Sequence, residues 1–306
     1  MKSNSWEIWI QGFKDYLSLE RNLSIHSVDA YIRDVNKLFE FDLDFLQQKG
    51  PLALTREDLE SFTSSLFGQG LEAKSQARII SGVKAFYKYL LLEDMLNINP
   101  AKMMDSPKLK RNLPDTISFD EIQLILDSMD MSVPVAHRNK AIIETLYACG
   151  LRVSELVHLR ISNYFPDLGW IKVLGKNNKE RMIPIAPSAI HQIELYLQSE
   201  RIHIPVHKEH SDIIFLNRRG QRLSRISVFQ IVKDAVEKAG IRKNVSPHTF
   251  RHSFASHLVE GGADLRAVQE MLGHESITTT EIYTHVHTDY LRKTLMLYHP
   301  GNRNRS

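Results

Sequence analysis

The sequence lacks several features that would place it in a specialised class of protein. Its single cysteine, Cys149, excludes a disulfide framework and a metal site built from several thiolates, and it fits a reducing cytosol. No apolar run approaches the ~20 residues that a membrane-spanning helix needs. The first residues, MKSNSWEIW, are polar and charged where a secretory signal has an apolar core. We therefore expect a cytoplasmic protein that does not insert into a membrane.

A strong net charge is also missing, which limits what composition can say about partners. The 306 residues carry a formal net charge of only +3, so any surface that binds nucleic acid must be a local cluster. Hydrophobic residues make up 42% of the chain, which is enough for folded cores. The length is typical of about two domains.

Helical patterns dominate residues 1–92, which we expect to form a helical bundle. Apolar residues recur at helical spacing over 25–41 and 73–93, and Ser24 is placed to cap the first of these helices. Residues 93–112 are rich in proline and basic side chains, and we interpret them as an extended linker.

Residues 113–306 predict a second domain that is mostly helical. Ser118 and Glu121 form a capping box, and the only strong β signal is a hairpin whose turn lies at 175–179. Residues 212–217 are a possible third strand. The predicted fold class is mainly α: a helical bundle plus an α-rich catalytic domain with a small antiparallel β-sheet.

The stretch SPHTFRHSFASHL begins at Ser246 and predicts an anion-binding helix start. Ser246 is a good N-cap and Pro247 suits the first turn. His248 and Arg251 are about 60° apart on one helix face. An imidazole and a guanidinium beside the positive end of a helix form an anion site.

A metal site in the same stretch is disfavoured by its geometry. His257 lies about 180° around the helix from His248, so the three histidines of the stretch cannot share one ion. The zinc-protease pattern needs a glutamate directly after the first histidine, and Thr249 stands there. We predict no metal, and we interpret His252 and His257 as packing residues.

Three further polar residues follow glycines: Arg152 after the Gly150 break, Lys176 after Gly175, and His274 after Gly273. A fourth, Tyr283, lies on a short third helix. Taken singly, Arg152 is typical of a capping or ion-pairing residue. Lys176 is typical of a solvated turn lysine.

The sequence contains five motifs in this order: GLRVSEL, the hairpin lysine after glycine, HTFRH, LGH, and a tyrosine nine residues later in EIYTHV. Taken together, these motifs resemble the tyrosine recombinase family of the phage-integrase type. The resemblance covers nearly the whole chain and is strongest to the Xer subfamily. It implies a nucleophile, Tyr283, that forms a covalent 3′-phosphotyrosine with DNA. It also implies a set of residues around the scissile phosphate: Arg152, Lys176, His248, Arg251 and His274.

The chemistry of that reaction explains these residue types. A tyrosine hydroxyl has a reference pKa of about 10, so it needs help to attack an anionic phosphodiester at neutral pH. Two arginines can stabilise the charge of the transition state, and Lys176 can protonate the departing 5′ oxygen. We expect an acid–base role for His248 and a hydrogen-bonding role for His274. Side-chain cations and the covalent intermediate would make the reaction independent of metal ions and ATP.

The Xer resemblance further implies chromosome-dimer resolution at a dif-like site during cell division. It implies a tetrameric synapse with a second Xer recombinase or with copies of this chain, an FtsK-type DNA translocase as activator, and two domains that close as a clamp on duplex DNA. Three alternatives stay open: a mobile-element integrase, a type IB topoisomerase-like enzyme, and a DNA-binding protein without catalysis.

DNA contacts outside the site should follow local basic clusters. The candidates are Lys108, Lys110, Arg111, Arg218, Arg219, Arg222 and Arg225. In the tail, apolar residues recur at helical spacing from Tyr290 to Tyr298, before Pro300. We interpret this as an interaction helix that docks on a neighbouring subunit, with packing on its own core as the alternative.

Overall fold

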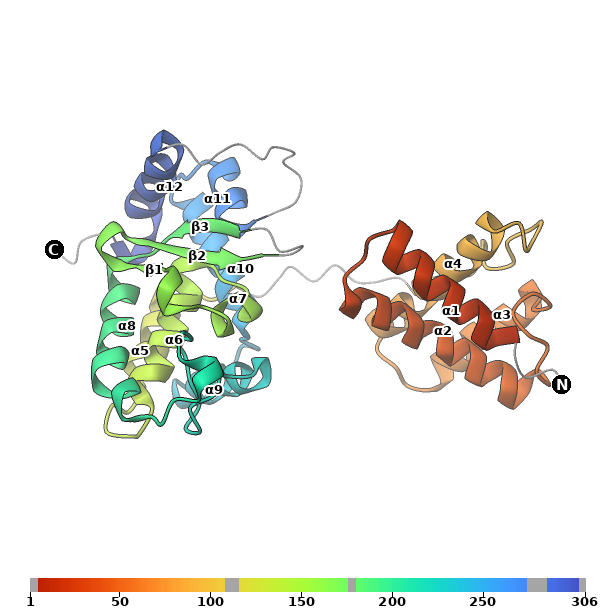
Figure 1. Cartoon of the computed structure of the whole chain (residues 1–306), viewed down its shortest axis with the longest axis horizontal. Coiled ribbons are helices and arrows are strands. Elements are labelled where there is room, and N and C mark those ends of the chain that lie inside the picture. Colours follow the sequence, from red (N-terminus) through yellow and green to blue (C-terminus); the bar gives the residue numbers. More distant parts are fainter. Residues whose placement is uncertain (1–4, 108–115, 176–179, 274–284, 303–306) are drawn as a thin grey trace. The chain divides into compact units, whose positions relative to one another are not determined.

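The computed structural model describes residues 5–107, 116–175, 180–273 and 285–302. The chain divides into two compact units, Met1–Asn112 and Leu113–Ser306 (Figure 1). Each unit has a buried hydrophobic cluster of its own. Within these described ranges, no helix is both long and apolar enough to cross a bilayer.

The N-terminal unit is a helical bundle, as the sequence predicts. Its elements are α1 (Ser5–Asp15), a π-helical turn (Tyr16–Glu20), α2 (Ile25–Phe45), α3 (Arg56–Gly68) and α4 (Ala73–Leu92). The Ser24 hydroxyl accepts a hydrogen bond from the Ser27 N–H at 3.3 Å, which confirms the predicted cap of α2. Helices α2 and α4 approach closely because Gly82 has no side chain: a Cβ there would lie 2.6 Å from the Cβ of Asp34.

Part of the segment predicted as a linker folds onto the N-terminal unit. Ala101 and Met104 are buried in its core. Asn99 forms a turn in which its side-chain oxygen accepts from the Ala101 N–H and its carbonyl accepts from the Lys102 N–H. The chain is therefore not extended up to Met104, because proline-rich polar sequence suits turns as well as extended chain.

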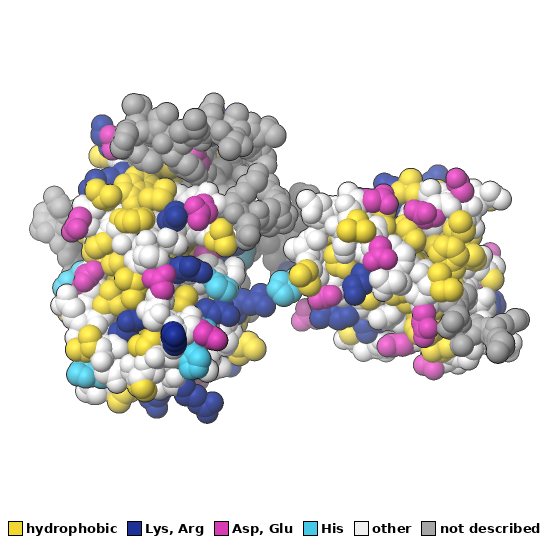
Figure 2. All heavy atoms as spheres, viewed as in Figure 1, with side chains coloured by type: hydrophobic (Ala, Val, Ile, Leu, Met, Phe, Trp, Pro, Cys, Tyr) yellow, Lys and Arg dark blue, Asp and Glu magenta, His cyan; other side chains and the backbone are white. Residues whose placement is uncertain are grey.

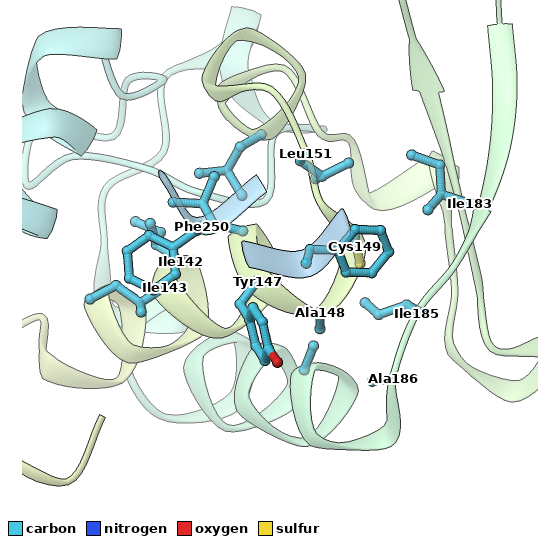
Figure 3. Packing of buried hydrophobic residues seen from close by; sticks show 14 of the residues in the cluster. Ile142, Ile143, Tyr147, Ala148, Cys149, Leu151, Ile183, Ile185, Ala186 and Phe250 are labelled. Atoms are coloured by element: carbon cyan, nitrogen blue, oxygen red, sulfur yellow. The ribbon is translucent and has the colours of Figure 1, made fainter. Parts of the chain in front are cut away.

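The C-terminal unit is built on a central helix. Its helices are α5 (Phe119–Asp127), α6 (Ala136–Cys149), α7 (Val153–Val157), α8 (Pro187–Ser199), α9 (Arg225–Lys238), α10 (Pro247–Glu260), α11 (Leu265–Leu272) and α12 (His285–Tyr298). Helix α6 is buried along most of its length, and Figure 3 shows its Ile142, Tyr147 and Cys149 among residues that include Phe250 of α10 and Ile183 of a neighbouring strand.

A small antiparallel sheet crosses this unit between α11 and α12 on one side and α5 to α9 on the other (Figure 1). Its strands, in spatial order, are β1 (Tyr164–Phe165), β2 (Trp170–Leu174) and β3 (Glu180–Pro184). The predicted hairpin and the predicted fold class are confirmed.

The prediction of a third strand at 212–217 is wrong, since β1 takes that place in the sheet. Residues 212–217 make only two isolated bridges, Ile213 with Arg160 and Leu216 with Arg222. All four residues from Ile213 to Leu216 are buried. A short apolar run cannot by itself separate a strand from a buried loop.

The tail helix α12 belongs to the core of its own unit. Leu291 and Leu295 are fully buried in the same hydrophobic cluster as Phe254 of α10, and Thr294 is buried beside them. Tyr290, at the start of the predicted stripe, is exposed. The centre of the stripe is therefore buried within this chain, and the docking of α12 on a neighbouring subunit stays a prediction.

Candidate active site

Arg152 lies at a sharp break between two helices. Helix α6 ends at Cys149, and the predicted break follows at Gly150, whose φ of 58° is in the left-handed region; α7 then begins at Val153. A Cβ on Gly150 would lie 2.5 Å from the Phe254 ring, so both the backbone and the packing require glycine here. The break leaves the Arg152 side chain 38% exposed at the start of α7.

Glu155, one turn into α7, is the buried carboxylate that organises the site. Its Oε1 lies 2.9 Å from Nη1 of Arg152 and 2.8 Å from Nη1 of Arg181. Its Oε2 accepts from the Arg152 backbone N–H at 2.8 Å and from Nη2 of Arg181 at 3.0 Å. Burial opposes ionisation, but the hydrogen bonds and charges of Arg181 and Arg152 outweigh it and hold the pKa of Glu155 below its ordinary value.

The C-terminal turn of α11 supplies three consecutive carbonyl oxygens, and each accepts from a different arginine. Arg181 donates to Met271, Arg251 to Leu272 and Arg152 to Gly273, at 3.2, 2.6 and 3.2 Å. Carbonyls at a helix C-terminus lack intrahelical partners and carry the negative end of the helix dipole. This turn therefore orients three guanidinium groups in one place.

Arg251 is the buried member of the arginine pair predicted from the sequence. It extends from α10, and its Nη1 donates to the Gly150 carbonyl at 2.7 Å. Burial, and then the positive charge of Arg152, lower the pKa of Arg251 to about 10, with Glu155 acting in the opposite direction. The group remains charged at neutral pH, and it is fixed to the same helix break that positions Arg152.

His248 lies one turn before Arg251 on α10. The predicted N-cap is confirmed, because the Thr249 N–H donates to the Ser246 hydroxyl at 3.4 Å. The His248 side chain is exposed, and its ring centroid is 5.6 Å from that of His252. Partial burial lowers the pKa of His248, and the charges of His252, Arg251 and Arg152 lower it further. A neutral imidazole in this place can accept a proton at pH 7.

Three of the six predicted catalytic residues, Lys176, His274 and Tyr283, lie outside the described residues. Their sequence neighbours are described. Lys176 belongs to the connection between β2 and β3, and His274 directly follows Gly273, whose carbonyl binds Arg152. The structure thus brings Arg152, from the helix break, together with Arg251 and His248, which lie one turn apart on α10.

His257 has the packing role that the sequence predicts. Its Nδ1 lies 2.8 Å from the Tyr147 hydroxyl, on the far side of α10 from His248. Within the ranges that the structure describes, no group of three or more His, Cys, Asp or Glu side chains is placed to hold a metal ion.

A tight turn presents two of the predicted DNA-binding arginines. Arg218 and Arg219 are exposed, and the Asn217 side-chain oxygen accepts from the backbone N–H of Arg219 at 2.9 Å. Gly220 closes the turn, since a Cβ there would lie 1.9 Å from the Pro205 carbonyl oxygen. The two charged side chains are therefore displayed on a tight turn that packs against Pro205.

The other predicted DNA-binding residues have different surroundings. Nη1 of Arg222 lies 2.6 Å from Nε2 of His158, and Arg225 is exposed in the first turn of α9. Lys108, Lys110 and Arg111 lie outside the described residues. Acidic and basic side chains are interspersed over the visible face of each unit in Figure 2, so charge on that face gathers only locally.

Sequence reasoning missed two residues of the site, Glu155 and Arg181. The signal for Glu155 was its position three residues after Arg152 at a helix start, where an acidic residue closes a capping box. The signal for Arg181 was strand alternation, which places it on the same face as Ile183, where an apolar residue is expected.

An α-rich unit that fixes arginines around one helix break is suited to hold an anion such as a phosphate. Residues 115–289 match the Phage integrase family, and residues 10–94 match the phage integrase N-terminal SAM-like domain. This chain therefore belongs to the phage integrase family and is a tyrosine recombinase, which confirms the resemblance in its motifs.

Individual relatives agree over nearly the whole chain. A tyrosine recombinase XerD of Chlorobaculum tepidum is 41% identical over 304 residues, covering 98% of this chain and 98% of that protein. A tyrosine recombinase XerD of Staphylococcus aureus is 36% identical over 301 residues, covering 96% and 99%. The crystal structure of the XerH site-specific recombinase bound to difH substrate, a pre-cleavage complex, has a TM-score of 0.70 at 22% identity and covers 98% of this chain and 97% of that chain. This last similarity shows the shared fold.

Proposed function

We propose that this recombinase resolves chromosome dimers at a dif-like site during cell division, by cutting and rejoining DNA through a 3′-phosphotyrosine. The observation that carries the proposal is the pair Arg152 and Arg251, which Glu155 and the end of α11 hold at one helix break. Support for the particular role comes from relatives that are named XerD.

The two arginines supply the positive charge that holds the scissile phosphate. Arg152 is partly exposed and can reach nonbridging oxygens directly, while Arg251 is buried below it and carries a second fixed charge. Guanidinium groups match phosphate oxygens in shape and charge. Because protein contacts hold these groups in place, they stabilise the developing charge with little reorganisation.

Tyr283 attacks the phosphorus, so that a bond from its oxygen to phosphorus forms while the bond from phosphorus to the 5′ oxygen breaks. His248 takes the tyrosine proton, and its lowered pKa keeps the imidazole neutral and ready to accept it. Lys176 gives a proton to the departing 5′ oxygen, and His274 donates a hydrogen bond to the phosphate. Rejoining reverses the step when a free 5′ hydroxyl attacks the phosphotyrosine.

The partners of the reaction are double-stranded DNA with a dif-like site and three further recombinase subunits. These subunits are copies of this chain or of a second Xer recombinase, in a tetrameric synapse. An FtsK-type translocase activates the assembly in the cytoplasm. Arg218 and Arg219 contact the DNA backbone, together with Arg222, Arg225 and the basic residues of 108–111.

The proposal is tested by trapping the covalent adduct on chromosomal DNA of the host. Denatured protein–DNA adducts are captured and sequenced, and the recovered site is placed twice in a plasmid. We expect one short recurrent site and excision between its two copies in cells that contain the chain. Adducts confined to mobile-element ends would contradict the proposal, as would supercoil relaxation without strand exchange, or DNA binding with no adduct.

A further inference from the structure

Arg181 is a buried charge on the core-facing side of strand β3. Its exposure is 7%, and Ile183, two residues later on the same face, is fully buried. The strand alternation alone calls for an apolar side chain at this position. A buried guanidinium persists only where its donors find partners, because an unpaired charge in a core is strongly unfavourable.

The contacts of Arg181 join three segments that are distant in the sequence. Two of its nitrogens form a bidentate pair with Glu155 of α7, at 2.8 and 3.0 Å, and its Nε donates to the Met271 carbonyl of α11 at 3.2 Å. Gly273 makes room for the side chain, since a Cβ there would lie 3.0 Å from Nε of Arg181. The strand is thereby tied to both elements that hold Arg152.

Arg152 depends on these same two elements for its orientation. Its only described side-chain partners are Glu155 and the Gly273 carbonyl, and its side chain is 38% exposed. If Arg181 were absent, Glu155 would lose its bidentate partner and would be free to change rotamer toward Arg152 or Arg251. The forked end of Arg152 would then lose its fixed direction.

We propose that Arg181 is a positioning residue for DNA cleavage, which acts through Glu155 and Met271 to orient Arg152 toward the scissile phosphate. Arg181 is buried and its three nitrogens are engaged inside the protein, so it does not itself touch the DNA. The inference rests on the proposed function of the site. It adds a contribution from β3, at the base of the hairpin whose connection carries Lys176.

The first test compares cleavage with binding in the full-length chain. Formation of covalent adduct is timed in single turnover on a duplex that carries the recovered site and a nick beside the scissile phosphate. We expect Arg181→Met to slow cleavage ~10²-fold, the scale of loss from misplacing a reacting group, with half-site affinity within about threefold of the unchanged chain. Lys172→Met is the matched control on the neighbouring strand, where the lysine pairs with Glu180 at 3.3 Å at the surface. It should cleave within about twofold of the unchanged chain.

The second test separates positioning from general damage. A scissile methylphosphonate has one nonbridging oxygen replaced by methyl and carries no charge, so it needs less from an oriented Arg152. The loss caused by Arg181→Met should shrink to about tenfold or less on this substrate, because the missing contact is to charge. An equal loss on both substrates, or no loss on the phosphate, would overturn the inference.

Two further variants keep the test decisive. Arg181→Met is folded if it unfolds cooperatively in denaturant. If it does not, the same comparison is made with Arg181→Lys, which keeps the charge but loses the bidentate geometry. The double variant Glu155→Gln with Arg181→Met should lose no more activity than the worse single variant, because both act on Arg152. Multiplied losses would show independent roles and overturn the inference. Failure of the unchanged chain to form any adduct would instead refute the proposed function.

Discussion

Arg251 and Leu272 are joined by a 2.6 Å hydrogen bond from Nη2 of the arginine to the carbonyl oxygen in the last turn of α11. The bond ties the first turns of α10 to the end of α11. The same guanidinium reaches the Gly150 carbonyl at the end of α6. A single buried side chain therefore holds the ends of two helices against a third, and the stability of the unit and the geometry of the site depend on the same contacts.

Tyr283→Phe should abolish the covalent protein–DNA adduct while binding to DNA is retained, because phenylalanine has no oxygen to attack phosphorus. Denaturing gels of adducts and native gel shifts measure the two properties. Tyr290→Phe is the control, since the Tyr290 hydroxyl donates to Asp264 at 3.4 Å at the surface. An adduct formed by Tyr283→Phe but not by Tyr290→Phe would move the nucleophile to Tyr290.

Lys176→Ala should slow cleavage of ordinary DNA by ~10²–10⁴-fold, the usual contribution of a general acid. A substrate with sulfur at the bridging 5′ position has a better leaving group and needs no acid, so it should restore much of the rate. Arg152→Ala should stay slow on both substrates, because its loss affects phosphate charge. If sulfur does not rescue Lys176→Ala, another residue is the acid, and Lys179 in the same connection is the first to test.

Cleavage should survive an excess of EDTA, because the proposed site uses arginine and lysine charges where a nuclease uses two metal ions. Adduct yield on the nicked substrate is measured with EDTA, Mg²⁺ and Zn²⁺. A strict requirement for either cation would contradict the proposed mechanism.

His299 should make the folded chain less stable in acid. Its ring is buried against Tyr147 and Phe254, with centroids 4.6 and 5.7 Å away, and burial lowers the pKa of His299 to about 3, with the charge of His257 acting in the same direction. An unfolded-chain histidine titrates near pH 6.5, so as the pH falls below that value the unfolded state binds a proton that the folded state rejects. Stability that is present above about pH 6.5 is therefore lost progressively as the pH falls.

The measurement is the free energy of unfolding in urea between pH 7 and 4.5. His299→Phe should reduce the pH slope below pH 6 by about 1.4 kcal/mol per pH unit, the value for one proton. The phenylalanine ring keeps most of the packing against the two aromatic neighbours. An unchanged slope would show that His299 does not reject the proton.

The double variant Arg218→Ala/Arg219→Ala should weaken DNA binding. It should also reduce the slope of log K for binding against log salt concentration by about 2, because each lost phosphate contact removes about 0.9. Gel shifts from low to moderate salt give the slope. Arg201→Ala is the control, since its guanidinium donates to the carbonyls of Ser211 and Ile213 inside the chain. An unchanged slope in the double variant would remove the exposed turn from the DNA interface.

Local features of the chain were readable from the sequence because they depend on neighbours a few residues apart. Three predicted helix caps are present: Ser24, Ser246, and the capping box of Ser118 with Glu121. The predicted break at Gly150 follows the end of α6. The motif spacing also identified the family, which the comparisons confirmed. All these inferences use short-range geometry or a recurrent pattern of residues.

Tertiary structure alone decided which side chains share a partner. Arg152, Arg181 and Arg251 are far apart in the sequence, and only the folded chain brings them to Glu155 and to three successive carbonyls of α11. It also decided that residues 212–217 are a buried loop and that Leu291 and Leu295 of α12 pack on their own unit. An apolar pattern indicates that a face will be buried, but which segment covers that face depends on how distant parts of the chain pack together.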